Sequence, residues 1–135
     1  MCQEEEYFER SQEDDSQLHL LVCADGNPVG VIGLTDIDRS WGNAEVGYYI
    51  DPDEAGRGYA TAAVSLVVEY AFDHLRLHKL EALVIANNDA SRRVLEKNEF
   101  EEEGYLREHA FVDGTIHDTY IFGLPKSEYS RNSAP

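Results

Sequence analysis

The sequence has few cysteines, few lysines and no long apolar run, and each shortage excludes a class of protein. Its two cysteines, Cys2 and Cys23, do not make a disulfide framework or a CxxC metal clip. No stretch reaches the roughly 18 apolar residues of a membrane span. No basic segment followed by an apolar one marks a signal peptide. We therefore expect a cytoplasmic protein with no membrane partner.

Positive charge is also scarce. The chain has 11 basic residues against 27 acidic ones, which gives a formal net charge of −16. A nucleic-acid-binding protein carries a basic footprint that is missing here, so we expect no nucleic-acid partner. Self-repulsion of this size is largely screened at about 1 M salt, where the Debye length falls to about 3 Å. The charge therefore suggests a halophilic origin.

The residues that are present suit one folded domain. The chain has 135 residues, of which 42% are apolar. That length and composition fit a single domain with a real core. We expect residues 1–17 to form the end of an acidic surface helix and residues 127–135 to form a flexible polar tail. No internal repeat or interdomain linker appears.

The hydrophobic pattern predicts an ordered series of strands and helices. "LHLLVCADGNPVGVIGLTDI" predicts two strands joined at a "DGN" turn, and "AEVGYYI" predicts a third strand. Apolar residues at helical spacing predict a long helix from about Gly58 to Leu75. "KLEALVIA" predicts a strand inside a sheet, and "NNDASRRVLEKNEF" a helix capped by Asn88 or Asp89. A strand pair then turns at Asp113–Gly114. The order predicts a mixed α/β fold whose central sheet is flanked by helices.

The loop "DPDEAGRGYAT" raises the first question about function. It has no Lys-Ser or Lys-Thr pair, as a Walker A loop requires. Gly56 and Gly58 fit two places of a dinucleotide fingerprint, but Thr61 takes the third, and the preceding strand lies too far away. A cradle of main-chain amides for a pyrophosphate fits, because its donors need no basic surface. An ordinary glycine-bearing entry to a helix fits the loop alone equally well.

The neighbouring motifs separate these alternatives. The segment from Glu45 to Phe100 resembles the core of the GCN5-related N-acetyltransferases, and more narrowly their RimJ/RimL-type branch. Further matches are "GYLRE" at Gly104–Glu108 and the pattern from Gly114 through Tyr120 to Leu124. The resemblance covers about Leu18 to Tyr129. It implies a mixed, mostly antiparallel sheet in which two central strands splay apart to hold acetyl-CoA.

The resemblance also implies which residues hold acetyl-CoA. The pantetheine arm would lie along the main chain of Tyr48, Tyr49 and Ile50. Asn88 and Ser91 match an NxxS element that faces the arm. The pyrophosphate would rest on the cradle, formed by the residues Gly56, Arg57, Gly58, Tyr59, Ala60 and Thr61.

Two positions depart from the pattern that the resemblance implies. Ala55 occupies a place that normally carries glutamine or arginine, which removes a side-chain contribution near the pyrophosphate. Glu99 replaces a glycine, so we expect a distorted turn there.

Acetyl transfer to an amine needs a base for the amine proton and a donor for the leaving thiolate. We expect Glu45, at the start of the strand that leads into the loop, to be the base; the alternative is a surface glutamate. Ser91 is the candidate donor, and the alternative is a first-turn serine that satisfies backbone amides. Tyr105 and Tyr120 are less favoured donors. His74 and His78 have metal-like spacing, but no further ligand lies nearby in the sequence, so we expect no metal.

The acceptor is the least determined part of the prediction. The resemblance implies a protein N-terminal amine. The acidic surface favours a small cationic amine such as a polyamine as an alternative. Ala55 and an N-terminus shorter than is usual in this branch favour a third possibility, an inactive regulatory module that binds acyl-CoA. A sheet edge left exposed by the short N-terminus would allow pairing into a homodimer.

Overall fold

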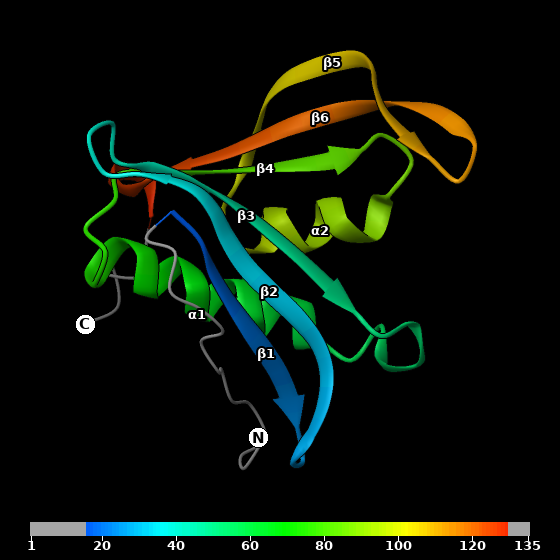
Figure 1. Cartoon of the computed structure of the whole chain (residues 1–135), viewed down its shortest axis with the longest axis horizontal. Helices are drawn as coiled ribbons and strands as arrows, with labels where there is room; N and C mark the ends of the chain where they lie inside the picture. Colours follow the sequence, from blue (N-terminus) through cyan, green and yellow to red (C-terminus); the bar gives the residue numbers. More distant parts are fainter. Residues whose placement is uncertain (1–15, 130–135) are drawn as a thin grey trace.

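A computed structural model of the chain describes residues 16–129 (Figure 1). They form one six-stranded sheet in the order β1-β2-β3-β4-β6-β5, with two helices. The mixed sheet and its flanking helices confirm the predicted fold class. The strands are β1 (Leu18–Ala24), β2 (Asn27–Asp38), β3 (Asn43–Ile50), β4 (Lys79–Ile85), β5 (Glu101–Val112) and β6 (Thr115–Pro125). The helices are α1 (Tyr59–Asp73) and α2 (Asp89–Lys97), with 3₁₀ turns at Pro52–Glu54 and Lys126–Glu128.

The centre of the sheet splits between β3 and β4. These two strands are parallel and pair at three positions, Asn43 with Lys79, Ala44 with Leu80 and Glu45 with Glu81. Beyond Glu45, β3 is paired with β2 only, while β4 stays paired with β6 along its whole length. Figure 1 shows the two strands diverging from that point. The strands beside them are all antiparallel, so the parting lies at the one parallel junction of the described sheet.

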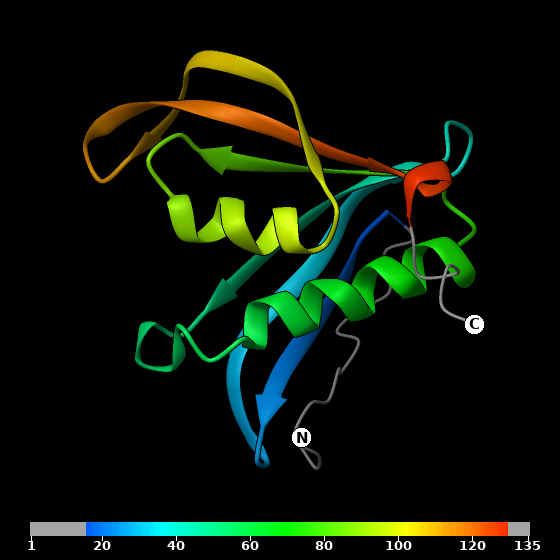
Figure 2. The same ribbon diagram turned by 180° about the vertical axis from the view of Figure 1, so that it is seen from behind.

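Both helices lie on the same side of the sheet, as Figure 2 shows. Alternation along β3 points Ala44 and Val46 to this side, where they are 4% and 3% exposed and join the core. The core is closed by large side chains that are almost fully buried, among them Phe72 of α1 and Phe122 of β6. The odd-numbered residues of β3, from Glu45 to Tyr49, point to the opposite side. No helix of residues 16–129 covers that opposite side.

The turn between α2 and β5 contains Glu99 in place of glycine. The turn still forms, because the Glu99 amide donates to the Glu96 carbonyl and the Phe100 amide donates to the Leu95 carbonyl, both at 3.0 Å. Glu99 reaches this geometry with a φ of 74°, in the left-handed region that favours glycine. The departure therefore places strain in one residue and leaves the path of the chain intact.

The two ends of the chain are described in part. Ser16 and Gln17 are not helical, and the rest of the predicted acidic helix end lies outside the described residues. The predicted flexible tail from 127 lies mostly outside the described residues, and its flexibility stays a prediction. Lys126–Glu128 form a 3₁₀ turn, and the ring of Tyr129 packs on that of Phe72 with centroids 5.2 Å apart. This ring contact partly buries Tyr129. Residues 130–135 lie outside the described part.

Candidate active site

The loop between β3 and α1 places two glycines in conformations that other residues avoid. Asp51 opens it by accepting a hydrogen bond from the Asp53 amide at 3.0 Å. Gly56 and Gly58 have φ values of 84° and 85°. Gly58 is the N-cap of α1 and offers no side-chain acceptor to the first amides of the helix. Those amides are left for another acceptor, which is the condition for an anion site at a helix N-terminus.

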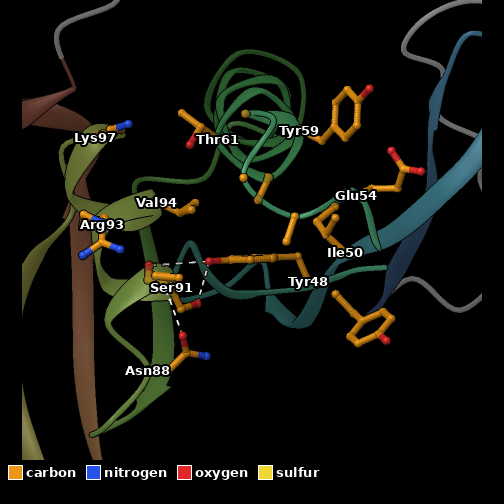
Figure 3. Close-up of a pocket in the computed structure, with 16 residues that line it drawn as sticks. Tyr48, Ile50, Glu54, Tyr59, Thr61, Asn88, Ser91, Arg93, Val94 and Lys97 are labelled. Carbon is orange, nitrogen blue, oxygen red and sulfur yellow. Dashed lines mark hydrogen bonds between the residues drawn. The ribbon is translucent and has the colours of Figure 1, made fainter. Parts of the chain in front are cut away.

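A pocket of about 400 Å³ lies at this end of α1. Figure 3 shows its walls, with the end of β3 and the loop on one side, the first turn of α1 above and α2 opposite. It lies on the helix side of the parting between β3 and β4. The residues that line it are Tyr48, Tyr49, Ile50, Glu54, Ala55, Gly56, Gly58, Tyr59, Ala60, Thr61, Asn88, Ala90, Ser91, Arg93, Val94 and Lys97.

The pocket thus gathers most of the predicted acetyl-CoA-binding residues. Of these, Arg57 alone is missing from the lining, because its exposed guanidinium turns to Glu54 at 3.6 Å. Ala55 lines the pocket, and its side chain is a single methyl group at a position where the resemblance implies glutamine or arginine. What the loop presents to a ligand is therefore mainly its own backbone.

Helix α2 forms the opposite wall and is fixed at both of its ends. The side chain of Asn88 accepts from the Ser91 amide at 3.0 Å, so Asn88 is the cap that the sequence left open between two residues. At the other end, the side-chain amide of Asn98 donates to the Thr61 carbonyl at 3.2 Å. That bond ties α2 to the first turn of α1. The pocket is consequently held open by a frame of two helices and one strand.

Ser91 faces β3 across the pocket. Its hydroxyl lies 2.6 Å from the hydroxyl of Tyr48, although the two residues are 43 positions apart in the chain. Tyr48 is half-buried, and burial raises the pKa of its phenol, while the hydrogen bond to Ser91 acts in the opposite direction. The sequence predicted a role for Tyr48 through its main chain alone. The contact between the two hydroxyls is visible only in the structure, because no sequence pattern links residues that lie so far apart in the chain.

Two cations on α2 were also missed. Arg93 and Lys97 are four residues apart and therefore lie on the same face of the helix, where both line the pocket. Glu54 is the one acidic residue among the lining residues. In a chain of net charge −16 the pocket thus carries locally more positive than negative charge. The i,i+4 spacing of Arg93 and Lys97, directly after the NxxS element, was the signal available in the sequence.

Glu45 lies on the opposite side of the sheet, at the point where β3 and β4 part. It is the last residue of β3 paired to β4, where its partner is Glu81. Its side chain is half-buried. Burial is the largest cause that raises the pKa of Glu45, followed by the charges of Asp36 and Glu81, while His109 acts in the opposite direction. A carboxyl with a raised pKa is a better proton acceptor than an ordinary surface glutamate.

The hairpin of β5 and β6 brings His109 toward Glu45. β5 is bulged between Leu106 and Ala110. Asp118 of β6 holds this bulge: it accepts from the Glu108 amide at 2.7 Å and from the hydroxyl of Tyr105. These contacts hold the pKa of Asp118 below its usual value. Asp118 thus has a structural role, and the hydroxyl of Tyr105 is bonded to Asp118 rather than directed into the pocket.

The described residues contain no group of three or more histidine, cysteine or acidic side chains placed to hold a metal ion. His74 stacks on Tyr70 with ring centroids 5.1 Å apart. The helices of residues 16–129 include none long and apolar enough to cross a membrane.

Comparison with known proteins agrees with this geometry. Residues 2–101 match the acetyltransferase (GNAT) domain family. The chain is 36% identical to the probable N-acetyltransferase YjcK of Bacillus subtilis over 121 residues, which cover 88% of this chain and 67% of that one. It is 36% identical to the putative ribosomal N-acetyltransferase YdaF of the same organism over 122 residues, covering 90% and 67%.

Solved structures of acetyltransferases superimpose on this chain. A variant of the spermidine N-acetyltransferase SpeG from Vibrio cholerae superimposes with a TM-score of 0.82 at 30% identity, covering 90% of this chain and 72% of that one. The first relatives are all longer, and the chain spans between 55% and 67% of their length. The match over residues 2–101, together with the splayed sheet and the pocket beside it, shows that the chain belongs to the GNAT family of acetyltransferases.

Proposed function

We propose that this chain transfers the acetyl group of acetyl-CoA to a primary amine, and that a protein N-terminal α-amine is its main acceptor. The observation that carries the proposal is the position of the pocket. It opens at the helix-side face of the parting, with unsatisfied amides at one end and Ser91 at the other. Glu45 stands at the same parting on the opposite face. The two faces offer separate approaches for donor and acceptor.

The residues present fit acetyl-CoA as the donor. The amides from Arg57 to Thr61 would hold the pyrophosphate, aided by the positive end of the α1 dipole. Arg93 and Lys97 add charge for the phosphates from the opposite wall. The end of β3 has no partner strand on its β4 side beyond Glu45. Its free main-chain groups there suit the amide-bearing pantetheine arm.

On the other face, Glu45 would take the proton from the amine, directly or through a water molecule. Its raised pKa brings proton acceptance closer to neutral pH than for an exposed glutamate. Attack by the neutral amine on the thioester carbonyl forms the new C–N bond. The C–S bond then breaks, and its electron pair leaves with sulfur. The resulting thiolate takes a proton from the Ser91 hydroxyl. Holding both reactants at the parting supplies much of the rate by fixing their orientation.

A small polyamine is the second candidate acceptor. Asp36 and Glu81 act electrostatically on Glu45, so three carboxylates gather where the amine would arrive. Such a group attracts a flexible cation with several amines. Relatives of this chain include proteins named spermidine N(1)-acetyltransferase, from Vibrio cholerae and Escherichia coli, at 28% and 30% identity. YdaF, named a putative ribosomal N-acetyltransferase, supports the first candidate instead.

Turnover of acetyl-CoA with a panel of acceptors tests the proposal. The panel holds N-terminal peptides, the same peptides with a blocked N-terminus, spermidine and a neutral amine, each in dilute and in molar salt. We expect thiol release with free N-terminal peptides and loss of it with the blocked ones. Preference for spermidine would favour the second candidate. Tight acetyl-CoA binding without turnover of any acceptor would make the chain a regulatory module. Absence of acetyl-CoA binding at every salt concentration would refute the proposal as a whole.

A further inference from the structure

The hydrogen bond between Tyr48 and Ser91 joins two walls of the pocket. Tyr48 projects from β3, and Ser91 stands in the first turn of α2. Figure 3 shows the phenol ring of Tyr48 extending across to the serine. Its hydroxyl is 2.6 Å from the Ser91 hydroxyl and 3.5 Å from the Ser91 carbonyl oxygen. The first distance is that of a short O–H···O bond, and the second is at the outer limit of a hydrogen bond.

The geometry of this bond lets either hydroxyl donate, and the acidities of the two hydroxyls favour Tyr48 as the donor. A phenol is a stronger proton donor than an aliphatic alcohol, and the alcohol oxygen is the stronger acceptor. Tyr48 therefore donates to the serine oxygen, which leaves the Ser91 proton free to turn into the pocket. The amide of Ser91 is occupied by Asn88, so the serine is held from both sides while its own proton stays available.

A serine hydroxyl by itself is a poor acid for a leaving thiolate. A thiol has a pKa near 8.5 and a phenol one near 10, whereas a serine alcohol is far less acidic than either. Net loss of a proton from Ser91 to the thiolate is therefore strongly unfavourable unless another group restores the proton. Among the residues that line the pocket, Tyr48 is hydrogen-bonded to the serine, and its phenol is less acidic than a thiol but far more acidic than the serine alcohol.

We propose that Tyr48 is a positioning residue that supplies the proton which Ser91 passes to the leaving thiolate. As the C–S bond breaks, the Ser91 proton moves to sulfur and forms the S–H bond. The Tyr48 proton moves to the serine oxygen, so that serine ends the step unchanged. The phenolate left on Tyr48 takes a proton from solvent water when the product leaves. The inference rests on the proposed acetyl transfer and assigns to Ser91 a relay rather than the source of the proton.

Burial of Tyr48 fits this role. Burial raises the pKa of the phenol, against a smaller opposite effect of the hydrogen bond to Ser91, and so favours the protonated form that a proton donor needs. A ring held in the wall of the pocket also costs little conformational entropy when the step occurs. The other tyrosine positions that we considered as donors, Tyr105 and Tyr120, line no part of the pocket.

The test is the pKa of the thiol of bound coenzyme A, measured by an NMR titration of coenzyme A labelled at the carbon next to sulfur. It needs no acceptor. We expect a lower thiol pKa in the wild-type complex than in free coenzyme A, because Ser91 donates to the thiolate. The Tyr48→Phe and Ser91→Ala variants should each raise it by about one unit, the size of a hydrogen bond to a charged group. The double variant should add little, because both residues act in one chain. Tyr70→Phe is the matched control: Tyr70 stands in the last turn of α1 and does not line the pocket, so this variant should leave the thiol pKa unchanged.

A second measurement separates proton supply from simple support of the serine. Replacement of Tyr48 by fluorotyrosine keeps the ring and its hydrogen bond but makes the phenol more acidic. We expect the bound thiol pKa to fall below the wild-type value. An unchanged thiol pKa in both Tyr48→Phe and the fluorotyrosine protein, with coenzyme A bound and Ser91→Ala raising the value, would overturn the role of Tyr48 alone. Failure of every variant and of the wild type to bind coenzyme A would overturn the proposed function with it.

Discussion

On the helix side of the sheet, the parting between β3 and β4 is lined by main-chain amides, by the hydrogen-bonded hydroxyls of Tyr48 and Ser91 and by the two cations of α2. On the opposite side, the same parting begins at three carboxylates. The first surface is suited to an anion and a thioester, and the second to an amine. The difference arises because alternate residues of β3 point to opposite faces. Tyr48 and Glu45, three positions apart, would thereby act on opposite sides of the proposed reaction.

Replacement of Glu45 by glutamine is the strongest test of the amine side. Glutamine keeps the shape of the side chain but cannot accept the amine proton. We expect kcat to fall by on the order of a hundredfold or more, the range of general-base catalysis, while binding of acetyl-CoA stays unchanged. Steady-state kinetics and calorimetric binding measure the two quantities. Glu102→Gln, on an exposed position of β5, is the control. Full activity in Glu45→Gln would remove the base assignment and leave the family membership intact.

Replacement of Gly58 by glutamate tests the opposite side. It adds a side chain at a φ of 85° and a negative charge at the N-terminus of α1. We expect the affinity for acetyl-CoA to fall about a hundredfold, from lost charge-assisted hydrogen bonds and repulsion of the phosphates. Gly114→Glu has the same charge and a φ of 76°, but lies in the hairpin turn away from the pocket. Equal affinity in the two variants would contradict the amide cradle.

The two cations of α2 should have a smaller effect. We expect Arg93→Ala and Lys97→Ala each to weaken binding of acetyl-CoA by about fivefold in dilute buffer, since exposed charge pairs contribute roughly 1 kcal/mol or less. The loss should shrink in molar salt, where such charges are screened. Arg76→Ala, beyond the other end of α1, is the control. Titrations at two salt concentrations measure the effect. A loss that is independent of salt would show that packing, rather than charge, is responsible.

The smallest effect concerns the carboxylates around Glu45. Their negative charges help to raise the pKa of Glu45, so neutralising them should lower it. Because the base must be deprotonated, the acid limb of the kcat profile should move to lower pH in Asp36→Asn and in Glu81→Gln. The shift should be larger in Asp36→Asn, since Asp36 is the larger of the two charge effects. A pH profile that is unchanged in both variants would show that Glu45 is not the group that titrates.

The sequence predicted the strand and helix order well because each element carries its own local signal. The "DG" dipeptides lie at the tight turns, the apolar spacing marks α1, and the mainly apolar "KLEALVI" indicates a strand. β4 does lie inside the sheet, between β3 and β6. The contacts that link distant segments were not predictable in this way. Tyr48 is hydrogen-bonded to Ser91, and Glu45 is paired with Glu81, because the fold brings together segments that are distant in the sequence.

Two errors of emphasis have physical causes. Arg57 was included in the predicted cradle, but its side chain pairs with Glu54 and does not itself line the pocket. Arg93 and Lys97 were overlooked, because in an acidic chain a charged helix face is usually a solvated one.

The most direct test of the account is a structure of the chain with coenzyme A bound. The account predicts the pyrophosphate on the amides from Arg57 to Thr61, the pantetheine arm along Tyr48 to Ile50 and the sulfur beside Ser91, on the helix side of the parting. Glu45 should face the sulfur from the opposite side of the sheet. Coenzyme A bound on the face that carries Asp36 and Glu45, or bound away from the parting altogether, would contradict the account.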